Sequence, residues 1–221
     1  MQHNKRKNLT QLVAQGYNFN LRTYLNQGWE IFKQNANTFI VSSIIFSVIL
    51  LIVIQFDNAL DFSQESNQFT LNPIGFVLHF FIREPLQTGF YVISLKLFQG
   101  KSSSFGDFFS WFGYYLQLVA AGFMTTLLII IGLVLFILPG FYLGVCYVLV
   151  PLLIVDRKLN FWEAMETSRQ LVSRNWLGWF SLSVNILGIH LLGFFACGFG
   201  LLISIPVSYA IWTAAYRDVV G

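Results

Sequence analysis

Three ionisable residues within one apolar stretch are the side chains with the clearest capacity for chemistry. His79, Arg83 and Glu84 interrupt the run Ile74–Phe98. Charge inside a membrane is costly, so an ionisable residue in a membrane-spanning segment is a candidate functional site by default. His79 and Arg83 are four residues apart and share a helix face, whereas the adjacent Arg83 and Glu84 do not face each other. The three residues therefore predict a polar intramembrane site for a small solute.

A second interpretation of these residues depends on their depth in the membrane. Arg83 is 13 residues before Lys96, which is about 20 Å along a helix. If Lys96 marks the inner interface, Arg83 lies about two-thirds of the way across. A long side chain at that depth can extend to the outer headgroups. A polar cavity and an outer-leaflet polar girdle are thus both open interpretations.

The composition excludes an ordinary soluble protein. Of the 221 residues, 56% are hydrophobic and 10% are charged, whereas soluble domains are about 45–50% apolar and about 25% charged. Intrinsic disorder is excluded as well, because it needs low hydrophobicity and high net charge. A net charge of +3 with scattered basic residues does not provide the basic surface that nucleic-acid binding needs. The remaining class is a polytopic membrane protein whose surroundings are the lipid bilayer.

The gaps between charged residues predict the membrane-spanning helices, because one span takes about 20 residues. The 23 uncharged residues between Lys33 and Asp57 fit one span. The 48 that precede Asp156 fit two, with a turn at Pro139-Gly140, and the 42 that precede Arg217 fit two more. We therefore expect a polar tail at 1–18 and a single membrane domain at 19–221, with six spans at 39–56, 75–98, 114–138, 140–155, 176–196 and 198–216.

The basic residues predict the orientation of these spans. The loop at 57–72 carries three acidic residues and no Lys or Arg, whereas twelve of the thirteen basic residues fall on the other side of a six-span chain. Cytoplasmic loops are enriched in Lys and Arg. We therefore expect both termini in the cytoplasm of a bacterium and the chain in its inner membrane. The twelve are Lys5, Arg6, Lys7, Arg22, Lys33, Lys96, Lys101, Arg157, Lys158, Arg169, Arg174 and Arg217.

The chain shows a three-fold pattern. An amphipathic stretch precedes each pair of spans, at 19–35, 105–114 and 161–171. Ser104 with Asp107, and Asn160 with Glu163, mark helix starts of the capping-box kind. A proline lies in the second arm of each pair: Pro85, Pro139 and Pro206. We expect an all-α fold of three membrane hairpins, each preceded by a cytoplasmic interfacial helix, although chance similarity among hairpins is the alternative.

Small residues at helical spacing predict close helix packing. Gly140 and Gly144 form a GxxxG pair, and Gly200, Ser204 and Ser208 follow one another at intervals of four. Such residues let two helices approach closely. Packing within the chain and packing in a homo-oligomer, or with a partner membrane protein, are both compatible with them.

Other single residues indicate structure rather than chemistry. His190 lies alone in an apolar run, which is typical of a hydrogen-bonded core histidine, with Asn185 as a possible neighbour. Cys146 and Cys197 also lie in apolar runs, where thiols are inert packing residues. No P-loop, HExxH or GxSxG pattern occurs. We therefore expect no catalytic residue, no metal and no cofactor.

Several short motifs together resemble the YciC-like family of bacterial six-span membrane proteins, which is similar to the membrane domain of some glycerophosphodiester phosphodiesterases. The resemblance implies a polytopic inner-membrane protein. The phosphodiesterase activity belongs to a separate soluble domain, so it implies no catalytic residue here. The motifs are Pro85–Gly89 with Leu95, Lys96 and Gly100; Ser104–Phe109; Leu138–Tyr142; Asp156 with Glu163, Ala164 and Ser168; and Pro206 with Ala215 and Tyr216.

Two functions fit these observations best. The leading hypothesis is a non-enzymatic scaffold or accessory protein in the inner membrane. The alternative is a small-solute transporter or channel that uses the region of His79, Arg83 and Glu84. An enzyme that acts on lipid is the third and weakest hypothesis.

Overall fold

The computed structural model of the chain describes residues 16–60, 73–196, 198 and 200–221, with the backbone alone at 56–60 and 73–80. The described residues form helices and no strands. The elements are α2 (Leu21–Gln34), α3 (Ala36–Leu60), α4 (Pro73–Phe98), the 3-10 helix η1 (Phe105–Tyr114), α5 (Tyr115–Leu135), α6 (Ile137–Cys146), α7 (Val150–Arg157), α8 (Phe161–Ser173), α9 (Trp176–Phe195) and α10 (Leu201–Val220).

Among the described residues, four stretches are long and apolar enough to cross a membrane. They are Ala36–Gln55, Phe105–Leu135, Ile137–Arg157 and Trp176–Phe195. The predicted all-α class and the general prediction of a membrane protein agree with this finding.

Side-chain caps start the helices where the sequence predicts them. The Glu163 backbone N–H donates to the Asn160 carboxamide oxygen at 2.9 Å, so α8 begins at Phe161 as predicted. The Ser104 backbone N–H donates to the Asp107 carboxylate at 2.9 Å, so the predicted helix start at Phe105 is also confirmed, as the start of η1. These caps satisfy N–H groups that have no partner within the helix.

The turn between the third and fourth predicted spans lies before Pro139-Gly140, so its predicted position is wrong. The chain turns at Phe136, which is extended (φ −155°, ψ 133°), and Pro139-Gly140 lies inside α6. Proline is tolerated in the first turn of a helix, because the N–H that it lacks would have no helical partner there. The dipeptide therefore lies within the first turn of α6, which begins at Ile137.

The predicted span 140–155 is also not one continuous helix. α6 ends at Cys146, residues 147–149 form a turn, and α7 begins at Val150 with Pro151 in its first turn. The hydroxyl of Ser168, from α8, closes this break. It donates to the Cys146 carbonyl at 2.6 Å and accepts from the Leu149 N–H at 3.3 Å.

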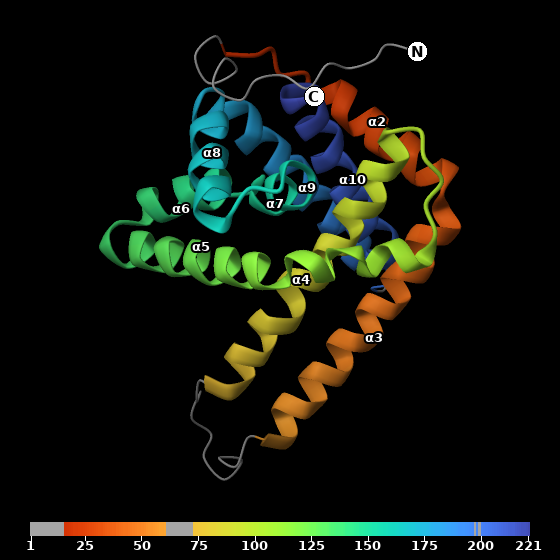
Figure 1. Ribbon diagram of the computed structural model, residues 1–221, viewed down its shortest axis with the longest axis vertical. Coiled ribbons are helices and arrows are strands. Elements are labelled where there is room, and N and C mark those ends of the chain that lie inside the picture. The colour runs from red at the N-terminus through yellow and green to blue at the C-terminus, as the bar shows by residue number, and fades with distance from the viewer. Residues whose placement is uncertain (1–15, 61–72, 197, 199) are drawn as a thin grey trace.

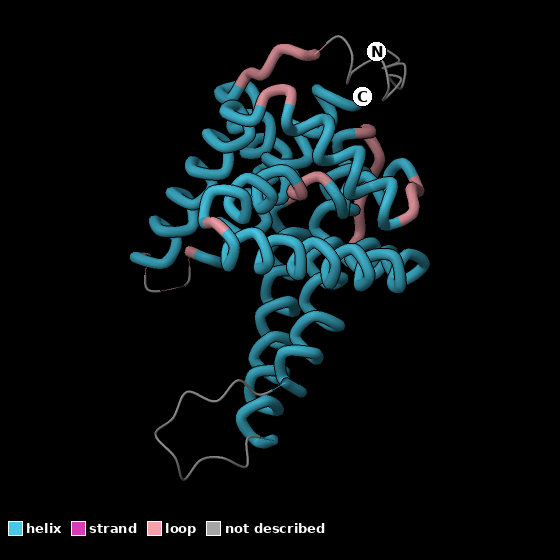
Figure 2. Tube along the Cα trace, turned by 90° about the vertical axis from the view of Figure 1, so that its left-hand side faces the viewer, coloured by secondary structure: helices cyan, strands magenta, loops and turns pink. Residues whose placement is uncertain are grey.

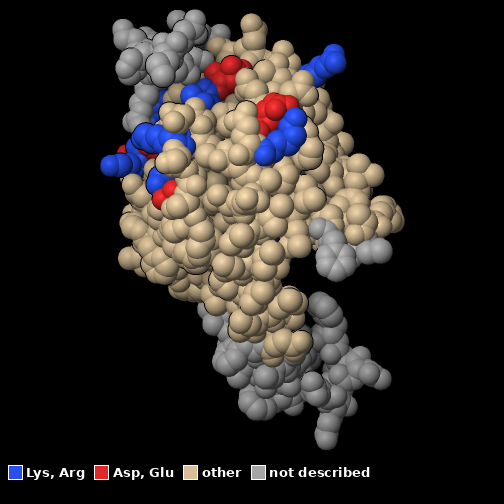
Figure 3. Space-filling model, turned by 90° about the vertical axis from the view of Figure 1, so that its right-hand side faces the viewer, with Lys and Arg blue, Asp and Glu red and all other residues tan. Residues whose placement is uncertain are grey.

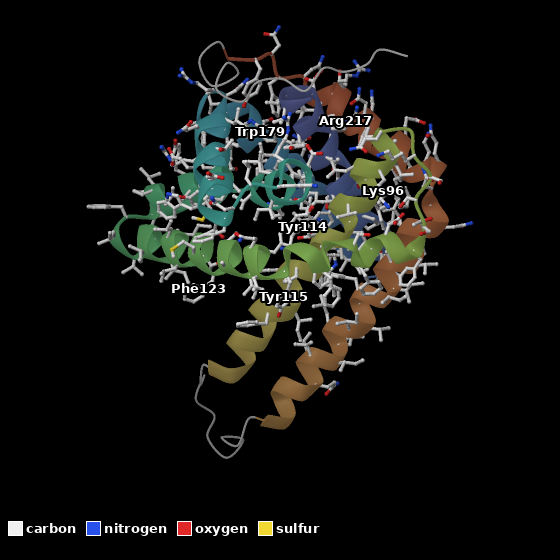
Figure 4. The ribbon with its side chains drawn as sticks, viewed as in Figure 1. Lys96, Tyr114, Tyr115, Phe123, Trp179 and Arg217 are labelled. Atoms are coloured by element: carbon white, nitrogen blue, oxygen red, sulfur yellow. The ribbon has the colours of Figure 1, made fainter. Side chains whose placement is uncertain are left out.

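A proline inside α4 is compensated in a similar way. Pro85 has no N–H, so the carbonyl of Phe81, four residues earlier, loses its helical partner. The hydroxyl of Tyr115, at the start of α5, donates to the Phe81 carbonyl at 3.1 Å. Figure 4 shows Tyr115 at this junction of α4 and α5.

The packing of the helices repeats around the molecule. α2 and α3 pack against α10, η1 and α5 pack against α4, and α8 and α9 pack against α6. Each amphipathic element and the helix after it thus meet the second arm of another segment of the chain. α10 is the most enclosed of these helices, with buried residues along almost its whole length.

The arrangement gives the molecule two distinct ends. In Figures 1 and 2, α5 lies across the molecule, while α3 and the first half of α4 extend beyond it as a protruding pair. Figure 3 shows that Lys, Arg, Asp and Glu on the drawn face gather at the opposite end. We call this the charged end, defined by Lys96, Arg157 and Arg217, of which Figure 4 labels the first and last.

Candidate functional site

A cavity of about 540 Å³ lies between the helices. It is lined by α3, α4, α5, α7, α9 and α10 and by the turn between α6 and α7, so residues far apart in the sequence meet there. Its polar lining residues are Arg83, Glu84, Gln87, Tyr91, Thr125, Tyr147, His190, Ser208 and Tyr209. The structure thus brings Arg83 and Glu84 to one cavity, whereas the side chain of His79 lies outside the described set.

A chain of hydrogen bonds orients the carboxylate of Glu84. The Gln87 Nε2 group, one turn further along α4, donates to Glu84 Oε2 at 2.7 Å. The Tyr209 hydroxyl, from α10, donates to Gln87 Oε1 at 2.8 Å. Because both ends of the Gln87 amide are engaged, its NH2 group points at the carboxylate. The sequence alone does not single out Gln87 or Tyr209, since their link joins two distant helices.

Aromatic packing fixes Tyr209 in the cavity wall. Its ring stacks on Phe90 with centroids 5.2 Å apart and planes at 9°, and it meets Tyr91 edge-to-face at 4.8 Å. Phe90 and Tyr91 are buried. Aromatic pairs of this geometry contribute beyond the area that they bury, so the hydroxyl that holds Gln87 is well positioned.

Arg83 and Glu84 differ in exposure although they are neighbours. The side chain of Arg83 is exposed, whereas Glu84 is partly buried, packed close to Gly122 of α5. A Cβ atom at Gly122 would lie 3.0 Å from Glu84 Cγ. The glycine therefore makes the space that the glutamate occupies, and consecutive helix positions explain why Arg83 faces another way.

His190 and Ser208 complete the polar lining on the side of α9 and α10. His190 Nδ1 lies 3.2 Å from the hydroxyl of Ser204 on α10. The expected neighbour Asn185 instead donates to the Ser181 carbonyl of its own helix. The Ser208 hydroxyl donates to the Ile205 carbonyl at 2.7 Å, so its helix backbone satisfies it at the cavity wall.

The predicted helix-packing residues fall into different environments. A Cβ at Gly140 would lie 2.5 Å from the Leu133 backbone nitrogen of α5, and one at Gly200 would lie 2.6 Å from Gly193 of α9. Both glycines thus allow close packing within the chain, and Ser204 also packs near Gly193. In contrast, nothing lies within 4 Å of a Cβ built at Gly144.

Gly144 instead faces a second, apolar groove. The groove has a volume of about 350 Å³ and lies between α5, α6 and α9. Its lining residues are Ile129, Leu133, Gly140, Phe141, Gly144, Val145, Phe180, Ser183, Val184 and Leu187.

Hydrogen bonds at the charged end tie the amphipathic segments to the bundle. The Trp179 Nε1 group donates to the Tyr17 hydroxyl, which donates to the Leu171 carbonyl at 2.8 Å. Burial raises the pKa of Tyr17 to about 12, and burial together with its bond to Asp218 raises that of Tyr24. Arg157 donates to the Val220 carbonyl at 2.6 Å. Figure 4 shows Trp179 in this region, while Phe123 lies on the outer edge of α5.

Comparison with known proteins finds relatives among mycobacteria. The chain is 26% identical over 235 aligned positions to "Uncharacterized protein Mb2590" of Mycobacterium bovis, which covers 96% of this chain and 71% of that protein. The same identity and coverage apply to "Uncharacterized protein MT2637" and "Uncharacterized protein Rv2560" of Mycobacterium tuberculosis. No family model matches the chain, and no solved structure matches it significantly. The resemblance to the YciC-like family stays a prediction.

The arrangement of the cavity is suited to binding. It combines an oriented carboxylate, hydroxyl groups and aromatic rings in a space that is within the range of about 300–1,000 Å³ typical of small-molecule sites. Glu84 could be identified from the sequence because charge is rare in an apolar run. Its partners could not, because Gln, Tyr and Ser occur throughout the chain.

Proposed function

We propose that the chain is a bacterial inner-membrane protein with six spans in three hairpins and both termini in the cytoplasm, and that its cavity binds a small solute and carries it across the membrane. The observation that carries this proposal is the polar cavity around Glu84 inside an apolar helix bundle. The proposal includes no catalytic step. The mycobacterial relatives support a bacterial setting.

Two helices beyond the four most apolar stretches supply the remaining spans of this proposal. α4 has 26 residues, about 39 Å of helix. α10 has 20 residues, about 30 Å, and is surrounded by protein. An enclosed helix does not need a lipid-facing surface, and small residues such as Ser204 and Ser208 favour its packing. Placing the charged end in the cytoplasm agrees with the enrichment of Lys and Arg there.

Interrupted helices around the cavity favour transport over simple scaffolding. Transporters commonly bind solute near the bilayer midplane, where helices are discontinuous. The break between α6 and α7 lines the cavity, and Pro85 interrupts the hydrogen bonding of α4 next to Glu84. Non-helical backbone at membrane depth is tolerated where it lines such a cavity.

Single cysteines test the proposed topology. In a variant with Cys146 and Cys197 replaced by alanine, cysteines at Ser63 and Leu138 should react with an impermeant maleimide added to intact cells. A cysteine at Ser102 should react only after the cells are opened. The cysteine at Leu138 is decisive for α5 and α6. It reacts from outside if the two helices span the membrane, and it does not if they lie at the cytoplasmic surface. Labelling of Ser102 in intact cells would contradict the orientation.

A flux assay tests the proposed transport. Proteoliposomes are loaded with the dialysable fraction of a bacterial extract, and solutes that leave them are identified by mass spectrometry. Thr125→Trp, which fills the cavity, should abolish a wild-type flux. The matched control Leu127→Trp, two residues along α5 on its exposed side, should retain it. Equal flux in the wild type, Thr125→Trp and empty liposomes would contradict transport.

One observation favours the scaffold as a second candidate function. Gly144 lies open in the apolar groove, and in a GxxxG pair it suits close packing against a helix of a second copy. A cysteine at Gly144, in the background without native cysteines, should then form a disulfide-linked dimer in membranes. A cysteine at Leu116, exposed at the other end of α5, is the control. A monomer in both variants would contradict this candidate.

A further inference from the structure

We propose that the solute held in the cavity carries a protonated amino group, which Glu84 binds, and an apolar portion, which the aromatic wall contacts. This inference rests on the proposed solute-binding function and deepens it by naming the class of ligand. It does not require that the solute be transported.

The charge of the lining favours a cationic ligand. Among the described residues that line the cavity, Glu84 and Arg83 carry formal charge at neutral pH. Arg83 is exposed and Glu84 is partly buried. Consecutive helix positions face different ways, and Glu84 is the more buried of the two charges. A charge in such a place is stable only when it is paired and hydrogen-bonded, so the carboxylate favours a cationic partner.

The geometry around Glu84 matches an ammonium group. The Gln87 bond uses one acceptor site at Oε2, whereas an ionised carboxylate offers about four. An ammonium group has three donors and no acceptor, so it fits an acceptor-only group without leaving a polar atom unpaired. Because Tyr209 already holds Gln87, the carboxylate is oriented before the ligand arrives, which lowers the cost of binding.

The remaining wall fits an apolar portion a few carbons from the amine. Phe46, Leu118, Tyr91 and Trp212 line the same cavity. Aromatic faces also attract cations at centroid distances of about 6 Å. An amine with a phenyl group or a short aliphatic chain therefore meets a complementary surface at both ends. A free amine and the headgroup of an aminophospholipid share this chemistry.

A pair of probes that differ in charge tests the inference. Binding of 2-phenylethylamine and of its neutral isostere 2-phenylethanol is measured by calorimetry on the purified full chain in detergent. The wild type should bind the amine and bind the alcohol at least about tenfold more weakly, because a charge-assisted hydrogen bond is worth about 1.5–3 kcal/mol. Glu84→Gln should weaken the amine about tenfold to hundredfold and leave the alcohol unchanged.

Two further variants keep this test decisive. Glu163→Gln removes an exposed carboxylate of α8 outside the cavity and should leave the binding of both probes as in the wild type. Tyr209→Phe releases Gln87 while keeping the aromatic packing, and it should weaken the amine several-fold and not the alcohol. If Glu84→Gln does not fold, this variant alone decides.

The outcomes separate the inference from the proposed function. Equal binding of the two probes would overturn the amine specificity and leave solute binding standing. Absence of amine binding in the wild type would also overturn it, while the flux assay with Thr125→Trp would still decide on transport. In nanodiscs of phosphatidylglycerol, added phosphatidylethanolamine should compete with the amine probe for the wild type if the natural ligand is a lipid, and should have no effect if it is a free amine.

Discussion

Replacing Ser168 by alanine should destabilise the protein strongly, although the change removes a single hydroxyl group. Ser168 is fully buried, and its hydroxyl is shared between the Cys146 carbonyl at 2.6 Å and the Leu149 N–H at 3.3 Å. Alanine leaves both groups without this partner, and an unsatisfied buried polar group costs about 1–3 kcal/mol. Since the second bond is long, we expect a total loss of about 2–4 kcal/mol.

Reversible unfolding in detergent, followed by tryptophan fluorescence across a denaturant titration, measures this loss. Ser173→Ala is the matched control, because the Ser173 hydroxyl bonds a carbonyl of its own helix, α8, and is half-buried. It should change the free energy of unfolding by less than about 0.5 kcal/mol. If Ser168→Ala were as stable as Ser173→Ala, the idea that α8 closes the break between α6 and α7 would be refuted.

Two further predictions concern glycines and pH. Gly28→Ala should lower the midpoint of thermal unfolding, because the added Cβ would lie 2.7 Å from the Ile211 backbone of α10. The control Gly144→Ala, whose Cβ would have nothing within 4 Å, should leave the midpoint unchanged or slightly raised. Equal midpoints for the two variants would contradict the close packing of α2 against α10. The raised pKa of Tyr17 means that the folded chain keeps a proton which the unfolded chain loses above about pH 10, so stability should be complete below that pH and fall towards pH 12. In a pH series of melting curves, Tyr17→Phe should reduce this loss of stability. An unchanged dependence on pH would contradict the role of the buried Tyr17 hydroxyl.

Local signals in the sequence predict the helix starts well. Asn160 with Glu163, and Ser104 with Asp107, act within a single turn, so three or four residues suffice to recognise them. The interval 176–196 likewise predicts α9 (Trp176–Phe195) closely, because Asn175 caps its start and the run is free of charge. Such features depend on neighbouring residues alone.

Features that need distant partners could not be predicted. Pro139-Gly140 is a strong turn signal, yet the turn lies at Phe136, because the first turn of a helix accepts proline equally well. The break after Cys146 leaves no clear mark in the sequence and is closed by Ser168 from another helix. The hydrogen bonds from Tyr209 to Gln87 and from Gln87 to Glu84 arise only when α4 and α10 pack together. Glu84 itself stands out in the sequence as a rare charge, whereas its partners do not.

The most direct test of the account is whether the cavity is open to water within the membrane. In the background without native cysteines, a cysteine at Ser208 lines the cavity and one at Leu187 lies on the exposed face of α9. We expect that an impermeant methanethiosulfonate reagent modifies the cysteine at Ser208, that 2-phenylethylamine slows this reaction, and that the cysteine at Leu187 stays unmodified in lipid. No reaction at Ser208 from either side of the membrane would contradict a solute-binding cavity.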